Sequence, residues 1–258
     1  IDTIIKYQYK GRIHADINPV RGEKGGTVTG RFSYSNPNLQ QVPARNKDLG
    51  PMIRSLFLPE RNHTWGCFDY SQQEPRLVVH YAAASPKLRE DDEVKDIVSR
   101  FNKDDVDFHQ TVADMAGIER IQAKTINLGL FYGMGKAKLQ AELGLSTKEE
   151  AEKLFEKYHS RVPFVKDLMN NTSRDSQRKG YITTLLGRRC RFDTWEEAVF
   201  RPGRLTSPMT WDEASSKFGE NNIRRAFTYK ALNKLIQGSA ADMTKKAMLD
   251  LYEEKIIP

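Results

Sequence analysis

The sequence has few cysteines and no long hydrophobic run. Its two cysteines, Cys67 and Cys190, show no paired spacing, which excludes a zinc-ribbon or disulfide framework and favours a reducing, cytoplasmic location. The longest apolar stretches, such as "LVVHYAAA" at 77–84, are far shorter than the ~20 residues of a membrane-spanning helix. The first ten residues also lack the basic and apolar regions of a signal peptide. We therefore expect no membrane partner.

Repeats and low-complexity tracts are absent as well, which indicates one evolved unit. Hydrophobic residues make up 38% and charged residues 29% of the 258 residues, as is typical of a folded globular protein. The net charge of +7 and the pI near 9.3 favour a polyanionic partner such as nucleic acid. The chain opens on Ile1 rather than Met, so we expect it to begin inside a longer protein.

The spacing of apolar residues changes along the chain. Residues 1–51 alternate Gly, Ser, Asn and Pro with single apolar residues, which predicts loops and short strands. Residues 54–70 predict two strands joined by a turn around 59–63. From 72 onward, apolar positions recur at three and four, which predicts a run of helices. A hairpin around Gly187 and a last helix from about 215 or 221 toward 254 complete an α+β pattern, which differs from the βαβ alternation of a dinucleotide fold.

A stripe of four residues runs through "ERIQAKTINLGLFYGMG". Arg120, Lys124, Leu128 and Tyr132 are four residues apart, and each step of four overshoots a helical turn by only ~40°. Two cations one turn apart match a triphosphate, and an aromatic farther along can meet a base or sugar. The alternative for an isolated helix is a solvated basic face beside a core aromatic.

Asp69 follows an apolar, strand-like run and is followed by Glu74 and Arg76 in "GCFDYSQQEPRLVVHYAA". A buried carboxylate needs a partner, because desolvating its charge costs several kcal/mol. A carboxylate at a strand end, with a second one nearby, is a typical way to hold Mg²⁺ against phosphates. The alternative is that Asp69 caps the helix that follows.

Four segments in order carry a family resemblance. "DYSQQEPR" and "RIQAKTINLGLFYG" resemble the first two catalytic motifs of the family A DNA polymerases, the group of bacterial DNA polymerase I and its phage relatives. "TVTGRFSYSNPNLQQVP" resembles the family's primer-template contact region, and "ALNKLIQGSAAD" resembles the helix before its third motif. These matches cover nearly the whole chain.

The resemblance implies a right-hand polymerase fold. Residues 1–77 would form the N-terminal part of the palm, 78–230 the fingers, and 231–258 the return helix of the palm. An antiparallel palm sheet would carry a large helical fingers insertion. The thumb and the last palm hairpin would lie outside this chain.

The resemblance also implies roles for individual residues. Asp69 would be catalytic and ligate two Mg²⁺ ions with the backbone carbonyl of Tyr70, and Lys124 would be a second catalytic residue. Glu74 would exclude ribonucleotides and bond to Tyr132. The implied nucleotide contacts are Gln72, Glu74, His109, Arg120, Lys124, Leu128, Tyr132 and Gly133. The implied primer-template DNA contacts are Arg31, Asn38, Gln40, Arg76, Asn233 and Gln237.

Several of these residues have plainer readings. His109 alone needs only one hydrogen-bond partner in a helix, and Asn233 and Gln237 could form a polar helix face. "GRRCR" at 187–191 could be a basic hairpin tip, although near DNA it would meet backbone phosphates.

Three features depart from the family pattern. Leu128 stands where relatives usually carry Phe or Tyr, which puts stacking on the sugar in doubt, and Gln73 and Pro75 replace apolar residues. Proline is tolerated in a first helical turn. The third motif, a His-Asp-Glu hairpin with the second metal-binding aspartate, is not found, and no acidic pair lies between two strand-like runs. We expect a further segment or subunit to carry it.

The expected function is template-directed DNA synthesis from a dNTP by a two-metal mechanism, as part of a larger or split polymerase. One alternative is a non-catalytic DNA- or nucleotide-binding fragment. Another is a relative of the single-subunit RNA polymerases, against which Glu74 speaks, because blocking the 2′-hydroxyl is useless to an enzyme that requires it.

Overall fold

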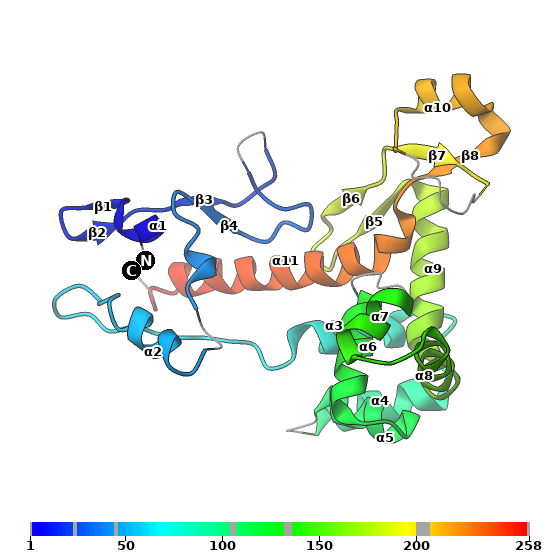
Figure 1. The fold of residues 1–258 in the computed structure, drawn as a ribbon, viewed down its shortest axis with the longest axis horizontal. Coiled ribbons are helices and arrows are strands. Elements are labelled where there is room, and N and C mark those ends of the chain that lie inside the picture. Colours follow the sequence, from blue (N-terminus) through cyan, green and yellow to red (C-terminus); the bar gives the residue numbers. More distant parts are fainter. Residues whose placement is uncertain are drawn as a thin grey trace. The chain divides into compact units, whose positions relative to one another are not determined.

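The computed structural model describes residues 2–22, 25–43, 46–103, 107–131, 136–199 and 207–256. The chain forms two compact units, Ile1–Ser71 and Gln72–Pro258. Figure 1 shows the elements of both units.

The first unit consists of short elements joined by loops, as residues 1–51 predict. Two antiparallel ribbons pair β1 with β2 and β3 with β4, and Ile17 lies opposite Tyr34 in the second. The elements are α1 (Asp2–Ile5), β1 (Gln8–Tyr9), β2 (Arg12–Ile13), β3 (Asp16–Asn18), β4 (Ser33–Ser35), the 3-10 helix η1 (Leu39–Gln41) and α2 (Leu49–Arg54).

The two strands predicted over 54–70 are wrong. Arg54 ends α2, residues 55–70 form no strand, and residues 61–70 are all exposed. A strand requires a partner whose N–H and C=O groups complete its ladder, and no described segment of this unit pairs with the stretch. Local bonds hold it instead, such as the one of 3.2 Å from Trp65 Nε1 to the carbonyl of Phe57.

The second unit is mainly helical, as the three-and-four spacing predicts. Pro163 begins α9 directly after α8 ends, and Thr147 caps α8 in a reciprocal pair with Glu150. The helices are α3 (Gln73–Ala84), α4 (Asp92–Asn102), α5 (Phe108–Ala116), α6 (Arg120–Phe131), α7 (Lys136–Leu143), α8 (Lys148–Arg161), α9 (Pro163–Lys179), α10 (Trp211–Phe218) and α11 (Ala231–Glu253).

The last helix starts later than predicted. A separate helix, α10, ends at Gly219, whose φ of 82° lies in the region that favours glycine. A short strand, β8 (Ile223–Arg225), and a 3-10 turn, η3 (Thr228–Lys230), come before α11. The predicted end near Glu254 is confirmed, since α11 ends at Glu253.

Both strand pairs of the second unit are antiparallel two-stranded ribbons. The predicted hairpin around Gly187 is confirmed by β5 (Tyr181–Thr183) and β6 (Arg189–Arg191). The other ribbon pairs β7 (Trp195–Glu197) with β8. Mixed helices and antiparallel strands agree with the predicted α+β class. Every sheet of the described residues has two strands, and the predicted palm sheet stays a prediction.

The main core of the second unit lies among its helices. Its largest fully buried side chains include Tyr158, Phe108, Phe164 and Ile97. The long helix α11 packs against α3 and α9 (Figure 1). Among the helices described, none is both long and apolar enough to cross a membrane.

A histidine at the edge of this core has no bonded partner for one ring nitrogen. His159 on α8 lies 5.2 Å from the ring of Phe155 and 5.4 Å from that of Tyr158, measured between centroids. Its Nδ1 is buried and bonds to none of the described residues. Burial, reinforced by the positive charge of Lys166, lowers the pKa of His159 to about 4.

This pKa predicts acid sensitivity. The unfolded chain binds a proton at His159 near pH 6.5 and the folded chain only near pH 4, so stability is lost as pH falls between these values. At pH 5 the loss amounts to about 2 kcal/mol relative to pH 8. Urea titrations at both pH values measure the decrease in the free energy of unfolding from pH 8 to pH 5. This decrease should be smaller in His159→Gln than in the wild-type chain by about 2 kcal/mol. His80, which is exposed on α3, supplies the control His80→Gln, and equal pH dependence in all three proteins would contradict the prediction.

Candidate functional site

One carboxylate joins the beginnings of α5 and α6. Asp107 Oδ1 accepts hydrogen bonds from the backbone N–H groups of His109 at 2.9 Å and Gln110 at 3.1 Å, which caps α5. Asp107 Oδ2 lies 2.8 Å from Nε and 2.6 Å from Nη2 of Arg120. Burial alone would raise the pKa of Asp107, but the bonds from Arg120, Gln110 and His109 hold it below its usual value. The cap thus stays ionised near neutral pH.

The junction also brings together the three predicted phosphate contacts. His109 is half-buried on α5, and burial lowers its pKa. The Asp107 charge opposes this shift, whereas the positive charges of Arg120 and Lys124 add to it. His109, Arg120 and Lys124 therefore form one electrostatic group, called the α5–α6 cluster here, with a neutral imidazole beside two cations.

The start of α3 is bonded to the start of α5. Gln72 adopts a left-handed backbone with φ of 52°, and its Oε1 accepts a bond of 2.7 Å from the N–H of Phe108. Glu74 is half-buried in the first turn of α3, where Pro75 is buried and accommodated as expected. The predicted nucleotide contacts Gln72 and Glu74 thus lie on an element tied to the α5–α6 cluster.

Arg76 supports the packing of two helices. Its Nη1 donates a bond of 3.3 Å to the carbonyl of Phe101, and its guanidinium lies 5.2 Å from the centre of that ring. These contacts hold α3 to the end of α4, and the predicted contact of Arg76 with DNA stays a prediction.

Asn233 and Gln237 lie one turn apart on α11. Gln237 is 8% exposed, so it does not belong to a solvated polar face. The buried Nδ2 of Asn233 has no hydrogen-bond partner among the described residues. A buried donor left unpaired costs about 1–3 kcal/mol, which is a cost that a polar ligand at this position would remove.

Asp69 and Tyr70 belong to the first unit and are exposed. Asp69 does not cap α3, because the cap position is held by Gln72. In the part of the chain that the structure describes, no group of three or more His, Cys, Asp and Glu side chains could hold a metal. The predicted role of Asp69 as a metal ligand therefore stays a prediction.

The predicted DNA contacts of the first unit lie in one loop region that flanks β4, and Gln40 within it belongs to the 3-10 helix η1. Asn38 Oδ1 accepts a bond of 3.1 Å from the N–H of Gln40, and Gln40 Nε2 donates one of 3.2 Å to the carbonyl of Phe32. Arg31 is exposed, and its carbonyl accepts a bond of 3.0 Å from Thr27 Oγ1. These bonds shape the loop and leave its side chains at the surface.

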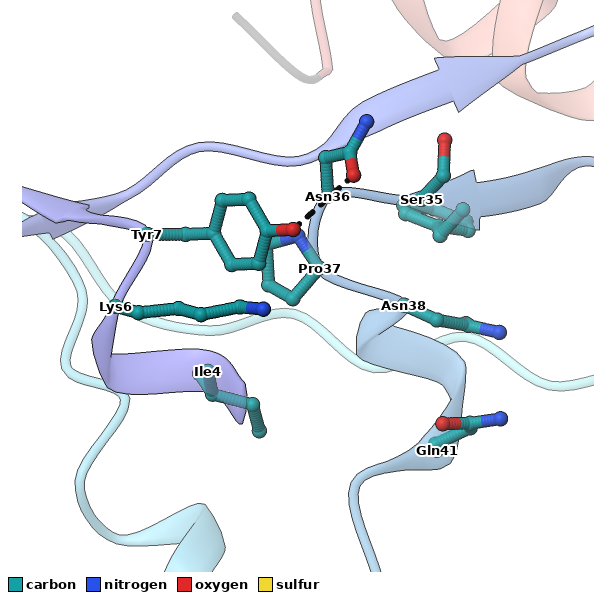
Figure 2. Close-up of a pocket in the computed structure, with 9 residues that line it drawn as sticks. Ile4, Lys6, Tyr7, Ser35, Asn36, Pro37, Asn38 and Gln41 are labelled. Carbon is teal, nitrogen blue, oxygen red and sulfur yellow. Dashed lines mark hydrogen bonds between the residues drawn. The ribbon is translucent and has the colours of Figure 1, made fainter. Parts of the chain in front are cut away.

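A polar pocket of about 320 Å³ adjoins this loop. Figure 2 shows the Tyr7 ring pointing toward Asn36, to whose Oδ1 its hydroxyl donates a bond of 3.1 Å. Lys6 and Asn38 also line the pocket. One cation and several amides around a cavity suit a phosphate or sugar group better than an apolar ligand.

The remaining predicted residues have mixed outcomes. Leu128 lies on α6 at the predicted spacing from the exposed Lys124, while Tyr132 and Gly133 lie outside the described residues. In "GRRCR", Arg188 donates from Nε to Asp242 Oδ1 at 2.9 Å, so it holds the hairpin to α11. Arg189 is exposed and is available for the predicted contact.

Three important residues were missed in the sequence. Asp107 precedes a helix and could have been found as an N-cap. Asn127 and Tyr158, which are fully buried, bond to each other across α6 and α8. A polar residue inside a helical pattern gives no sign of its partner, so no sequence signal distinguishes this pair.

Comparisons with known proteins show the family of the chain. The model of DNA polymerase family A matches residues 1–255. A DNA-directed DNA polymerase of Pseudomonas phage M6 is 34% identical over 97% of this chain and 40% of its own length. DNA polymerase I of Geobacillus stearothermophilus is 34% identical over 97% of this chain and 28% of its own length.

A solved structure has a similar fold. The POL domain of Pol1 from M. smegmatis, in a complex with DNA primer-template and dNTP, superposes with a TM-score of 0.70 at 27% identity. The match covers 98% of this chain and 40% of that one. This chain thus spans no more than 40% of the length of these three relatives. By the family match over nearly all of its residues, the chain belongs to DNA polymerase family A.

Proposed function

We propose that the chain is the palm-and-fingers part of a DNA-directed DNA polymerase. The reaction is template-directed attack of a primer 3′-hydroxyl on the α-phosphate of a dNTP, with release of pyrophosphate. The observation that carries the proposal is the α5–α6 cluster, in which Arg120 and Lys124 act electrostatically on His109 and Arg120 bonds to Asp107 at the start of α5. Residues 1–77 and 231–258 are assigned to the palm and 78–230 to the fingers, with a cytoplasmic location.

The α5–α6 cluster would bind the triphosphate. Arg120 and Lys124 supply two positive charges at successive turns of α6, which oppose the charge of the phosphates. Holding the triphosphate in line with the primer hydroxyl lowers the barrier through positioning, which is the main protein contribution to phosphoryl transfer. Asp107 is bonded to Arg120, so the guanidinium of Arg120 must either bind the carboxylate and the incoming phosphate together or leave the carboxylate.

Asp69 and the carbonyl of Tyr70 are proposed as ligands of two Mg²⁺ ions. The ions would neutralise charge on the reacting phosphate. The second aspartate would come from a further polypeptide segment or subunit with a His-Asp-Glu motif. Two observations support such a segment: the donor set of the described residues is incomplete, and residues 61–70 are exposed, including Trp65 at 70% and Phe68 at 75%.

The other contacts follow the family assignment. Glu74 would close the space beside the sugar and bond to Tyr132, while Leu128, Gly133 and Gln72 would border the nucleotide. Primer-template DNA would contact three residues of the first unit and three of the second, namely Arg31, Asn38 and Gln40, and Arg76, Asn233 and Gln237. The buried, unpaired Nδ2 of Asn233 supports a polar ligand at α11.

The incomplete donor set favours one alternative, a fragment that binds DNA or nucleotide without catalysis. Both functions require binding of DNA or nucleotide, and only the first requires synthesis by the assembled protein. Primer extension therefore separates them.

Primer extension by the 258-residue chain is the first test. We expect the chain to bind primer-template DNA, measured by fluorescence anisotropy, without Mg²⁺-dependent extension. With the completing segment present, extension should appear, and Asp69→Ala should lower its rate by on the order of 10²–10³-fold, because charge stabilisation at the reacting group is lost. Absence of primer-template binding would refute the proposed function. Extension by the chain alone would refute the need for a further segment.

A second test frees Arg120 while keeping the helix cap. Asn is a good N-cap, so Asp107→Asn should retain α5 and remove the negative charge that holds Arg120. We expect dATP binding, measured by calorimetry, to tighten by up to about fivefold, since an exposed ion pair is worth about 0.2–1 kcal/mol. Glu119→Gln, an exposed residue beside Arg120, is the matched control for charge. Weaker binding by Asp107→Asn would show instead that Asp107 positions Arg120 for the phosphates.

A third test concerns the sugar. Glu74→Ala should reduce the preference for dATP over ATP in the complex with primer-template by about tenfold, because one steric contact is worth about 1–3 kcal/mol. The ratio of the two dissociation constants is the measurement, and Gln73→Ala, at the neighbouring position of α3, is the control. An unchanged ratio in Glu74→Ala would remove Glu74 from sugar selection.

A further inference from the structure

A chain of buried side-chain hydrogen bonds leads from α8 through α6 to His109. The hydroxyl of Tyr158 donates to Oδ1 of Asn127, and Nδ2 of Asn127 lies 3.2 Å from Nδ1 of His109. Tyr158 and Asn127 are both 0% exposed. Neither side chain is charged, and neither is assigned a contact with nucleotide or DNA. A fully buried polar pair of this kind needs its own explanation.

The direction of each bond follows from the proton that each group carries. Burial raises the pKa of Tyr158 far above its usual value, so the hydroxyl keeps its proton. It therefore acts as a hydrogen-bond donor. Within the described residues, its acceptor is Oδ1 of Asn127. The amide is thereby oriented with Nδ2 toward His109, and an amide nitrogen can only donate. Nδ1 of His109 must then accept, which leaves the proton of the neutral ring on Nε2.

The surroundings of His109 make this tautomer decisive. The positive charges of Arg120 and Lys124 disfavour the protonated, charged form of the ring. The negative charge of Asp107 favours that form, but its Oδ1 accepts bonds from backbone N–H groups and its Oδ2 binds Arg120. A neutral ring binds a phosphate oxygen only through a ring N–H. With Nδ1 occupied by Asn127, Nε2 is the one nitrogen left for a ligand.

We propose that Asn127 and Tyr158 are positioning residues that hold neutral His109 with its proton on Nε2, so that the ring donates to a nucleoside triphosphate bound at the α5–α6 cluster. The identity of the ligand rests on the proposed function, whereas the control of the tautomer does not. The opposite tautomer would present a lone pair to the phosphate oxygens and repel them.

Nitrogen chemical shifts of His109 test the tautomer directly, without any nucleotide. In the ¹⁵N-histidine-labelled chain at pH 8, long-range proton–nitrogen correlation spectra should show Nε2 protonated and Nδ1 unprotonated, with signals assigned by their loss in His109→Gln. Tyr158→Phe should release the amide of Asn127 and shift the two nitrogens toward averaged values. Asn127→Asp, whose carboxylate can only accept, should move the proton to Nδ1.

Tyr81→Phe is the matched control for Tyr158→Phe. The hydroxyl of Tyr81 also makes an internal bond, of 2.6 Å to Ser239 Oγ, but it has no bonded path to His109 among the described residues. It should leave the His109 shifts unchanged. A wild-type ring with its proton on Nδ1, or shifts unaffected by both Tyr158→Phe and Asn127→Asp, would overturn the proposal.

Binding of dATP tests whether the tautomer of His109 contributes to phosphate binding. Tyr158→Phe should weaken binding by about two- to tenfold, the range of one neutral hydrogen bond, and Tyr81→Phe should not. Unchanged binding in Tyr158→Phe, with its nitrogen shifts altered, would overturn the role in phosphate binding. A wild-type chain with the expected tautomer that binds no dATP would refute the nucleotide site itself while upholding the hydrogen-bonded control of His109.

Discussion

The carboxylate of Asp107 is the interaction on which the arrangement of the site depends. One oxygen supplies the acceptor that the first turn of α5 needs, and the other holds the first residue of α6, Arg120. Without it, the start of α5 would lose its cap and Arg120 would lose its bonded carboxylate. Because both helix starts converge on one anion, the cationic residues of α6 lie beside the imidazole of α5 before any ligand arrives.

Polar contacts also hold helices and strands together elsewhere in the second unit. Arg188 bonds through two nitrogens to Asp242 and to the carbonyl of Gly238, which fixes the hairpin of β5 and β6 on α11. Tyr81 and Gln73 of α3 bond to Ser239 and Ala240 of the same helix. Hydrophobic burial brings these elements together, while directional bonds determine how far along α11 each one lies.

Much of this could be read from the sequence. Helical spacing located the helices of the second unit, and Gly187 located a hairpin, because both signals are local. The stripe of Arg120, Lys124 and Leu128 did fall on one helix. The predicted strands before Asp69 were wrong, since a strand depends on a partner that composition does not reveal. The bonds from Tyr158 to Asn127 and from Gln72 to Phe108 were missed for the same reason, as they join residues far apart in sequence.

The bond from Gln72 to Phe108 has a mechanical consequence. It fastens the residue before α3 to the first residue of α5, next to His109, and Glu74 follows in the first turn of α3. In the proposed function, Glu74 contacts the sugar and His109 contacts the phosphates. A displacement of α5 when the substrate binds would therefore move the start of α3 with it. Contacts with the sugar and with the phosphates would then form in one concerted movement rather than in two successive ones.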